Sequence, residues 1–125
     1  MLKCIRLELA RTPEHPEGNA GCGYEFVAPL DREGHLDADA WPKVGAQCTV
    51  RRFWVGADDE HGHLIRTRNH RWVFSYAPGE DDDEPIFKFD RHLMKPGEYV
   101  TITEHDGLAR PFRVAAVTPA AAAAA

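Results

Sequence analysis

His61 and His63 have the spacing in this sequence that best suits metal chemistry. Residues two apart on a strand point to the same side, so both imidazoles would face one way and could chelate a metal ion. The neighbouring carboxylates of Asp58, Asp59 and Glu60 could add oxygen ligands. A catalytic zinc needs three protein ligands, and only the two histidines stand at a clear spacing. The histidine pair is therefore a candidate metal site, which would imply a metal-dependent enzyme. A polar strand edge is the alternative interpretation.

A second candidate site is the basic and aromatic stretch between residues 51 and 76. Its proposed ligand-binding residues are Arg51, Arg66, Arg68 and Arg71. The rings that alternate with them are Phe53, Trp54, Trp72, Phe74 and Tyr76. On an exposed sheet face, such rings stack on bases while guanidinium groups neutralise phosphates. The stretch therefore predicts binding of a phosphate-bearing ligand or nucleic acid. The same rings also suit a barrel core, where they could not stack on bases.

Nucleophilic catalysis finds little support in the sequence. Cys22 stands between two glycines in an expected loop, and Cys48 in an expected strand, but neither has a base at a recognisable spacing. Ser75 is the only serine, and it lies inside an expected strand. The glycines stand at turns and form no phosphate-binding loop. We therefore name no catalytic residue.

The acidic run from Glu80 to Glu84 is the remaining stretch with metal-binding chemistry. Its oxygens could hold calcium or magnesium, but it lacks the alternate ligand spacing and internal glycine of an EF-hand loop. We interpret it as a solvated charge run and predict no cofactor.

The segment Lys95-Pro96-Gly97-Glu98-Tyr99-Val100, followed by Arg110-Pro111-Phe112, resembles the flavin-binding strands of the ferredoxin-reductase barrel. The resemblance would place Arg110 on a flavin phosphate, and it covers about twenty residues. Arg113 stands where that family has a hydroxyl residue. We interpret the likeness as a shared way of starting a barrel strand, because likeness of fold does not establish function.

Short alternating segments must position these candidate sites. Strands are expected at residues 2–10, 24–28, 47–55, 61–67 and 71–77, with loop chemistry at residues 12–23 and a polar turn at 56–60. A short extended piece is expected at 86–89. Asp106-Gly107 separates two further runs, 98–104 and 111–117, which is a strong hairpin signal. Residues 36–44 predict one or two turns of helix, with Pro42 in the first turn. This spacing predicts a mainly β fold: a small, partly open barrel or a strongly bent antiparallel sheet with one short helix.

The alternation also predicts which side chains fill the interior. On the strand at 47–55, Val50, Arg52 and Trp54 share one face and Phe53 lies on the other, and we expect Trp54 inside. The expected core comprises Ile5, Leu7, Leu9, Tyr24, Phe26, Val50, Trp54, Leu64, Trp72, Phe74, Tyr76, Val100, Ile102, Phe112 and Val114.

Length and charge limit the remaining possibilities. The 125 residues suit one domain, expected at 1–117, and an alanine-rich tail follows at 118–125. The formal charge of −5 gives no general attraction to nucleic acid or anionic lipid. Three widely spaced cysteines and a start without an apolar leader favour a cytoplasmic protein with reduced thiols.

The residues together predict a small cytoplasmic binding or accessory module without catalytic activity of its own. Its partner would be another protein or a second copy of the chain, since open sheet edges suit such contacts. Phosphate-ligand or nucleic-acid binding is the first alternative, and a metal-dependent enzyme built on the two histidines is the second.

Overall fold

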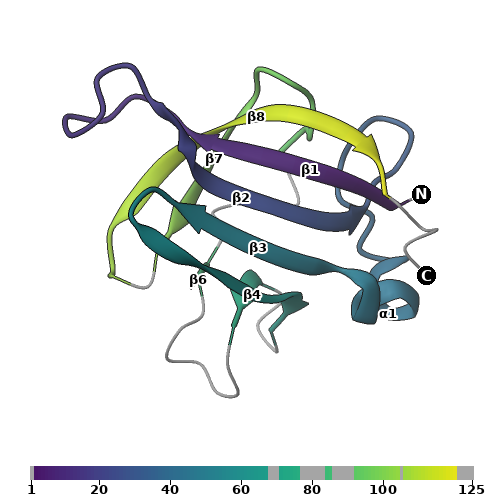
Figure 1. The fold of residues 1–125 in the computed structure, drawn as a ribbon. Helices are drawn as coiled ribbons and strands as arrows, with labels where there is room; N and C mark the ends of the chain where they lie inside the picture. Colours follow the sequence, from purple (N-terminus) through teal and green to yellow (C-terminus); the bar gives the residue numbers. More distant parts are fainter. Residues whose placement is uncertain (1, 68–70, 77–83, 86–91, 105, 121–125) are drawn as a thin grey trace.

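The computed structural model describes residues 2–67, 71–76, 84–85, 92–104 and 106–120 (Figure 1). Most of this chain is strand. The strands are β1 (Leu2–Leu9), β2 (Asn19–Pro29), β3 (Thr49–Trp54), β4 (Ala57–Arg66), β5 (Trp72–Ser75), β6 (Glu84–Pro85), β7 (Tyr99–Thr103) and β8 (Ala109–Pro119). One short helix, α1 (Trp41–Val44), precedes a single 3-10 turn, η1 (Gly45–Gln47). Neither helical segment has the length or apolar character needed to cross a membrane.

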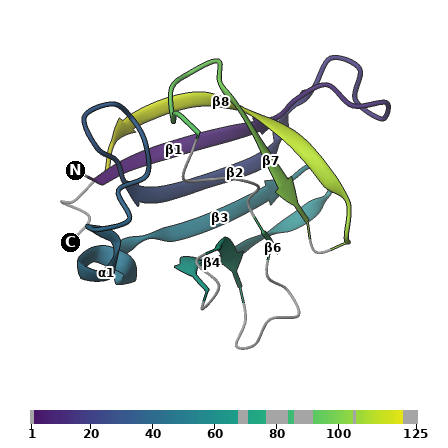
Figure 2. The same ribbon diagram turned by 180° about the vertical axis from the view of Figure 1, so that it is seen from behind.

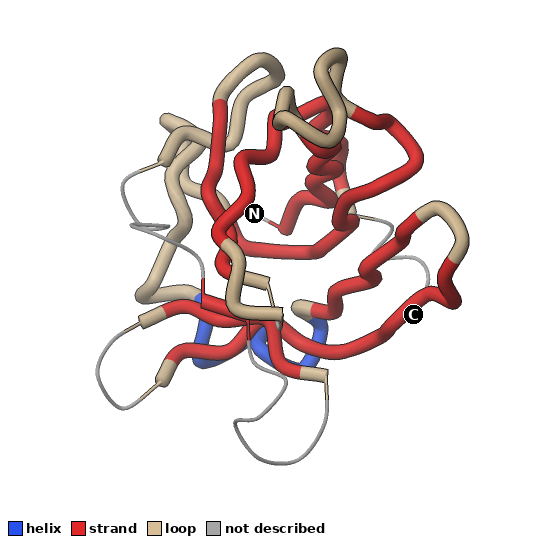
Figure 3. The backbone as a smooth tube through the Cα atoms, turned by 90° about the vertical axis from the view of Figure 1, so that its left-hand side faces the viewer, coloured by secondary structure: helices blue, strands red, loops and turns tan. Residues whose placement is uncertain are grey.

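All the strands belong to one antiparallel sheet in the order β6-β5-β4-β3-β2-β1-β8-β7. Neighbours in sequence pair from β1 to β6 and again from β7 to β8, and β8 pairs with β1 to join the two runs into one sheet. The sheet curls until its two edge strands, β6 and β7, contact each other without a ladder in the described residues (Figures 2 and 3). This arrangement confirms the predicted mainly β fold and its partly open barrel.

Large rings fill the interior of the curled sheet. Tyr24 lies 5.1 Å from both Phe74 and Phe112, measured between ring centroids, and Phe26 lies at the same distance from Phe74. Of the fifteen core residues expected from the alternation, all are buried except Trp54 and Tyr76, which are half-buried against the core. The two-residue period of the strands was therefore sufficient to identify the inside.

Several strand boundaries differ from the sequence prediction, including those of β2, β4 and β8. β2 begins at Asn19, inside the stretch expected to be a loop, because glycine permits a close approach there: a Cβ on Gly23 would lie 1.9 Å from the Leu7 carbonyl oxygen. The expected polar turn at 56–60 is short, and β4 begins at Ala57 after Gly56, whose φ is 82°. β8 continues to Pro119, two residues beyond the expected end of the domain.

The helix and both sequence-predicted hairpins agree with expectation. Pro42 stands in the first turn of α1, where a missing amide hydrogen costs nothing. The Trp41 ring packs edge-on against Trp72 at 5.6 Å, and its indole nitrogen donates to the Leu64 carbonyl oxygen at 3.1 Å. β4 pairs with β5, and β7 pairs with β8 around a turn in which Gly107 has a φ of 84°. The extended piece expected at 86–89 lies outside the described residues.

Candidate functional site

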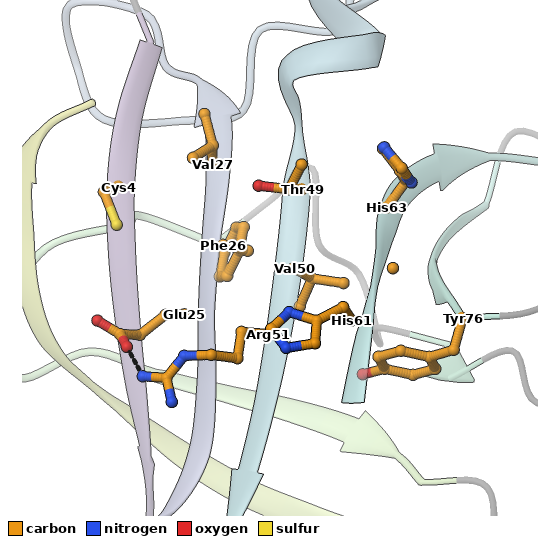
Figure 4. Close-up of a pocket in the computed structure, with 11 residues that line it drawn as sticks. Cys4, Glu25, Phe26, Val27, Thr49, Val50, Arg51, His61, His63 and Tyr76 are labelled. Carbon is orange, nitrogen blue, oxygen red and sulfur yellow. Dashed lines mark hydrogen bonds and ion pairs between the residues drawn. The ribbon is translucent and has the colours of Figure 1, made fainter. Parts of the chain in front are cut away.

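A shallow hollow of about 620 Å³ lies on the outer face of the sheet, across strands β1 to β4 (Figure 4). We call it the outer hollow. The register explains which side chains meet there: Arg51 stands opposite Glu25 on one side and His61 on the other, and Thr49 stands opposite His63. Side chains at such paired positions share one face. The side chains that border the hollow are Cys4, Glu25, Val27, Thr49, Arg51, His61, His63 and Tyr76.

A chain of ion pairs crosses the outer face beside the hollow. We call it the outer ion network, and its members are Arg6, Glu8, Glu25, Arg51, Asp59 and Arg113. Arg51 is its best-connected cation: one terminal nitrogen donates to Glu25 and the other lies 2.9 Å from Asp59. With three positive and three negative members, the network has no net charge. The side chains of its members are between 18% and 45% exposed to solvent.

The Phe53 ring contacts two arginines of this network and helps to fix their positions. It points to the outer face, as the alternation predicts, yet only 7% of the residue is exposed. The Arg6 guanidinium lies 4.3 Å and the Arg51 guanidinium 5.0 Å from the ring centroid. Two cations over one ring remove it from water and fix both guanidinium groups. The ring thus gives the border of the outer hollow a defined geometry.

The two histidines of the candidate metal site both line the outer hollow and are exposed. Figure 4 shows the His61 ring beside Arg51 and the His63 ring farther along β4, pointing away from it. Within the described ranges, no three histidine, cysteine, aspartate or glutamate side chains are grouped so that they could hold a metal ion. The part of the chain that the structure describes therefore adds no third ligand to the pair.

The four proposed ligand-binding arginines do not share one face. Arg51 lies on the outer face, whereas Arg66 stands opposite Trp72 with its guanidinium 5.4 Å from that ring, on the side of the core. Arg71 is exposed where β5 begins, and Arg68 lies outside the described residues. Side chains alternate between the two faces of a strand, and this alternation puts Arg51 of β3 on the outer face and Arg66 of β4 on the core side.

The rings expected to stack on bases are mostly interior. Trp72 and Phe74 are buried, and Phe53 is covered by two guanidinium groups. A ring that packs in the core offers no free face to a base. Of the described groups, the arginines and the half-buried Tyr76 ring at the outer hollow remain for contact with a phosphate-bearing ligand, and that function stays a prediction.

A second group of polar side chains lies inside one end of the barrel. Glu104, which directly follows β7, is the only charged residue among the buried ones of the described chain, with 2% of its surface exposed. Its carboxylate accepts a hydrogen bond from the Tyr24 hydroxyl at 2.6 Å and from Arg52 Nε at 3.1 Å. Arg110 Nη1 donates to its other oxygen at 2.7 Å. We call these four residues the Glu104 cluster.

The Glu104 cluster is also bound to its surroundings. The Arg52 guanidinium stacks 4.3 Å from the Trp54 ring, and Arg110 pairs with Asp106 at 2.9 Å. Burial by itself lowers the pKa of Arg52, but attraction to Glu104 and hydrogen bonds to Tyr24 and Glu104 outweigh it, so that the pKa is raised. The hydrogen bond to Asp106 is the largest cause of the raised pKa of Arg110. Both arginines therefore stay charged.

Sequence reasoning missed the Glu104 cluster, although one signal was present. Arg52 alternates with Val50 and Trp54 on the face predicted to be internal, and a buried guanidinium requires a carboxylate. That partner, Glu104, is 52 residues away in sequence. Arg110, which the flavin-barrel resemblance would place on a phosphate, instead contacts Glu104 and Asp106, and Phe112 lies in the core.

The cysteines considered as nucleophiles are both inaccessible. Cys22 and Cys48 are at most 1% exposed. Burial raises the pKa of the Cys48 thiol to about 11, and its sulfur lies 3.4 Å from the Val44 carbonyl oxygen. A thiol must ionise to act as a nucleophile, so Cys48 is inert near neutral pH.

Comparison of the chain with models of protein families, with curated proteins and with solved structures gives no match. The outer hollow and the Glu104 cluster are therefore the features from which a function can be inferred.

Proposed function

We propose that this protein is a small binding module without catalytic activity of its own, and that it holds a partner protein at the outer hollow. The observation that carries the proposal is the hollow itself. Val27, Cys4 and Tyr76 give it apolar surface, while Thr49, Arg51 and the two histidines provide hydrogen-bonding groups around it. Apolar surface surrounded by polar groups is typical of the sites where proteins meet.

The charges beside the hollow support a protein partner over a nucleic acid. The outer ion network is balanced, and both terminal nitrogens of Arg51 already contact carboxylates. A polyanion would have to compete with Glu25 and Asp59 for that guanidinium. A protein surface can instead place apolar groups in the hollow and leave the ion pairs intact at the rim.

The interior of the barrel supports the same choice. The rings of Tyr24, Phe26, Phe74 and Phe112 contact one another in the space where a ligand-binding barrel would hold its ligand. The Glu104 carboxylate is surrounded by three donors. These contacts favour a binding site on the outside of the sheet.

Site-specific photo-crosslinking in the cells that produce the protein tests this function. A photoreactive residue at Thr49, exposed beside the hollow, is expected to give one defined crosslinked protein; Leu108, 54% exposed on the turn before β8, is the control position. The mass of the product distinguishes a second copy of this chain from a different partner. Val27→Glu should abolish the Thr49 product while leaving the thermal unfolding midpoint unchanged. Identical products at Thr49 and Leu108, or no defined product at Thr49, would overturn the proposal.

A further inference from the structure

The β7–β8 hairpin closes one side of the curled sheet, and its two strands are held in different ways. β8 pairs with β1 from Lys3 to Leu9. β7 is five residues long and, among the described strands, pairs with β8 alone. The β7 side of the hairpin is therefore the less firmly paired one, and it faces the opening of the barrel next to β6 (Figure 2).

Glu104 connects this side of the hairpin to the opposite wall. It stands immediately after β7, while its partners Tyr24 and Arg52 belong to β2 and β3. These contacts span 80 and 52 residues of sequence, and they cross the interior of the barrel. Arg110 approaches the same carboxylate from β8, so that the carboxylate joins three separate strands. A buried carboxylate without such donors is strongly disfavoured.

We propose that the Glu104 cluster controls a local opening of the barrel between β6 and β7. While Tyr24, Arg52 and Arg110 hold the carboxylate, β7 stays packed on the core. When Tyr24, Arg52 and Arg110 release the carboxylate, β7 and Glu104 leave the core as one unit, while β1 to β4 stay paired. Proteins open in such contiguous units. β7 suits one because it is a short edge strand: its Val100 and Ile102 pack in the core, it pairs with β8 alone among the described strands, and Glu104 ties its end to the opposite wall.

Amide hydrogen exchange followed strand by strand tests this inference on the full chain. The variant is Glu104→Gln, which keeps the size of the side chain and removes its charge. Exchange of the amides in 99–103 is expected to become at least roughly tenfold faster, while the amides of β1 to β3 stay within about twofold of the parent protein. The matched control is Asp106→Asn, which changes an exposed partner of Arg110 and should leave β7 protected.

Two results would overturn the inference. One is a β7 that exchanges as slowly in Glu104→Gln as in the parent. The other is equal acceleration in every strand, which would make Glu104 a contributor to global stability alone. If Glu104→Gln does not fold, the same exchange measurement is made on Tyr24→Phe and judged by the same two results. This variant removes the 2.6 Å hydrogen bond to Glu104 and retains the ring that packs on Phe74 and Phe112.

Discussion

The outer ion network and the Glu104 cluster are built from the same side chains, arginine and carboxylate, but in opposite surroundings. In the outer network, the side chains of Arg51 and Asp59 are 36% and 42% exposed. In the cluster, those of Arg52 and Glu104 are 12% and 1% exposed. Water screens the first pair and is excluded from the second. Similar distances, 2.9 and 3.0 Å, therefore correspond to very different energetic roles.

Burial, rather than the number of ion pairs, decides what each group of charges does. The outer network covers Phe53 and shapes a surface, and its members can exchange partners with solvent at little cost. The Glu104 cluster joins three strands, and none of its members can leave without exposing another to an apolar interior. The outer face is thus suited to recognition and the barrel end to holding the fold together.

The largest effect is expected from Arg52→Met. The change leaves the buried Glu104 carboxylate with one cation fewer, which should lower the free energy of unfolding by about 3–5 kcal/mol. Urea denaturation followed by tryptophan fluorescence measures the loss. Arg6→Met on the outer face is the matched control and should lower it by about 1 kcal/mol or less. Equal losses in the two variants would contradict the distinction between the regions.

The fold was largely predictable because its causes are local. Alternation along each strand identified the inner face, and Asp106-Gly107 identified the closing hairpin. The preference for Trp54 as an inside position is consistent with its packing on Phe112 at 6.5 Å, while Phe53 lies outside. The early start of β2 was not predictable, because a glycine signals a turn unless the close approach of another strand is known.

The polar sites were harder to predict because they depend on pairing between distant segments. The sequence placed Arg51 in a basic stretch, but its partner Glu25 comes from β2, and only the register between β2 and β3 brings them together. The spacing of His61 and His63 correctly predicted a shared face, yet it could not show how the two rings are directed. The period of a strand predicts which face a side chain lies on, but only the register between strands determines which side chains on that face meet.

A smaller effect is expected from Arg51→Ala on the outer face. The variant loses two ion pairs and one of the cations over Phe53, and unfolding should require about 1 kcal/mol less. Repeating the urea titration in high salt sharpens the comparison, because screening should shrink the difference for Arg51→Ala and leave the loss for Arg52→Met nearly unchanged. A salt response of the same size in both would show that water reaches the barrel end as well.

The smallest effect is expected from Asp59→Asn, at about 0–0.5 kcal/mol in the free energy of unfolding. Arg51 keeps Glu25 in this variant, so the guanidinium remains over Phe53. A double-mutant cycle with Arg51→Ala isolates the pair, and its coupling energy should fall within the same range. Glu25→Gln is the matched comparison, because Glu25 also contacts Arg6 and its loss should therefore cost more. A coupling energy above about 1.5 kcal/mol for the Asp59 pair would be as large as that of a buried ion pair. The outer ion network would then stabilise the fold, and a partner could not disturb its ion pairs at little cost.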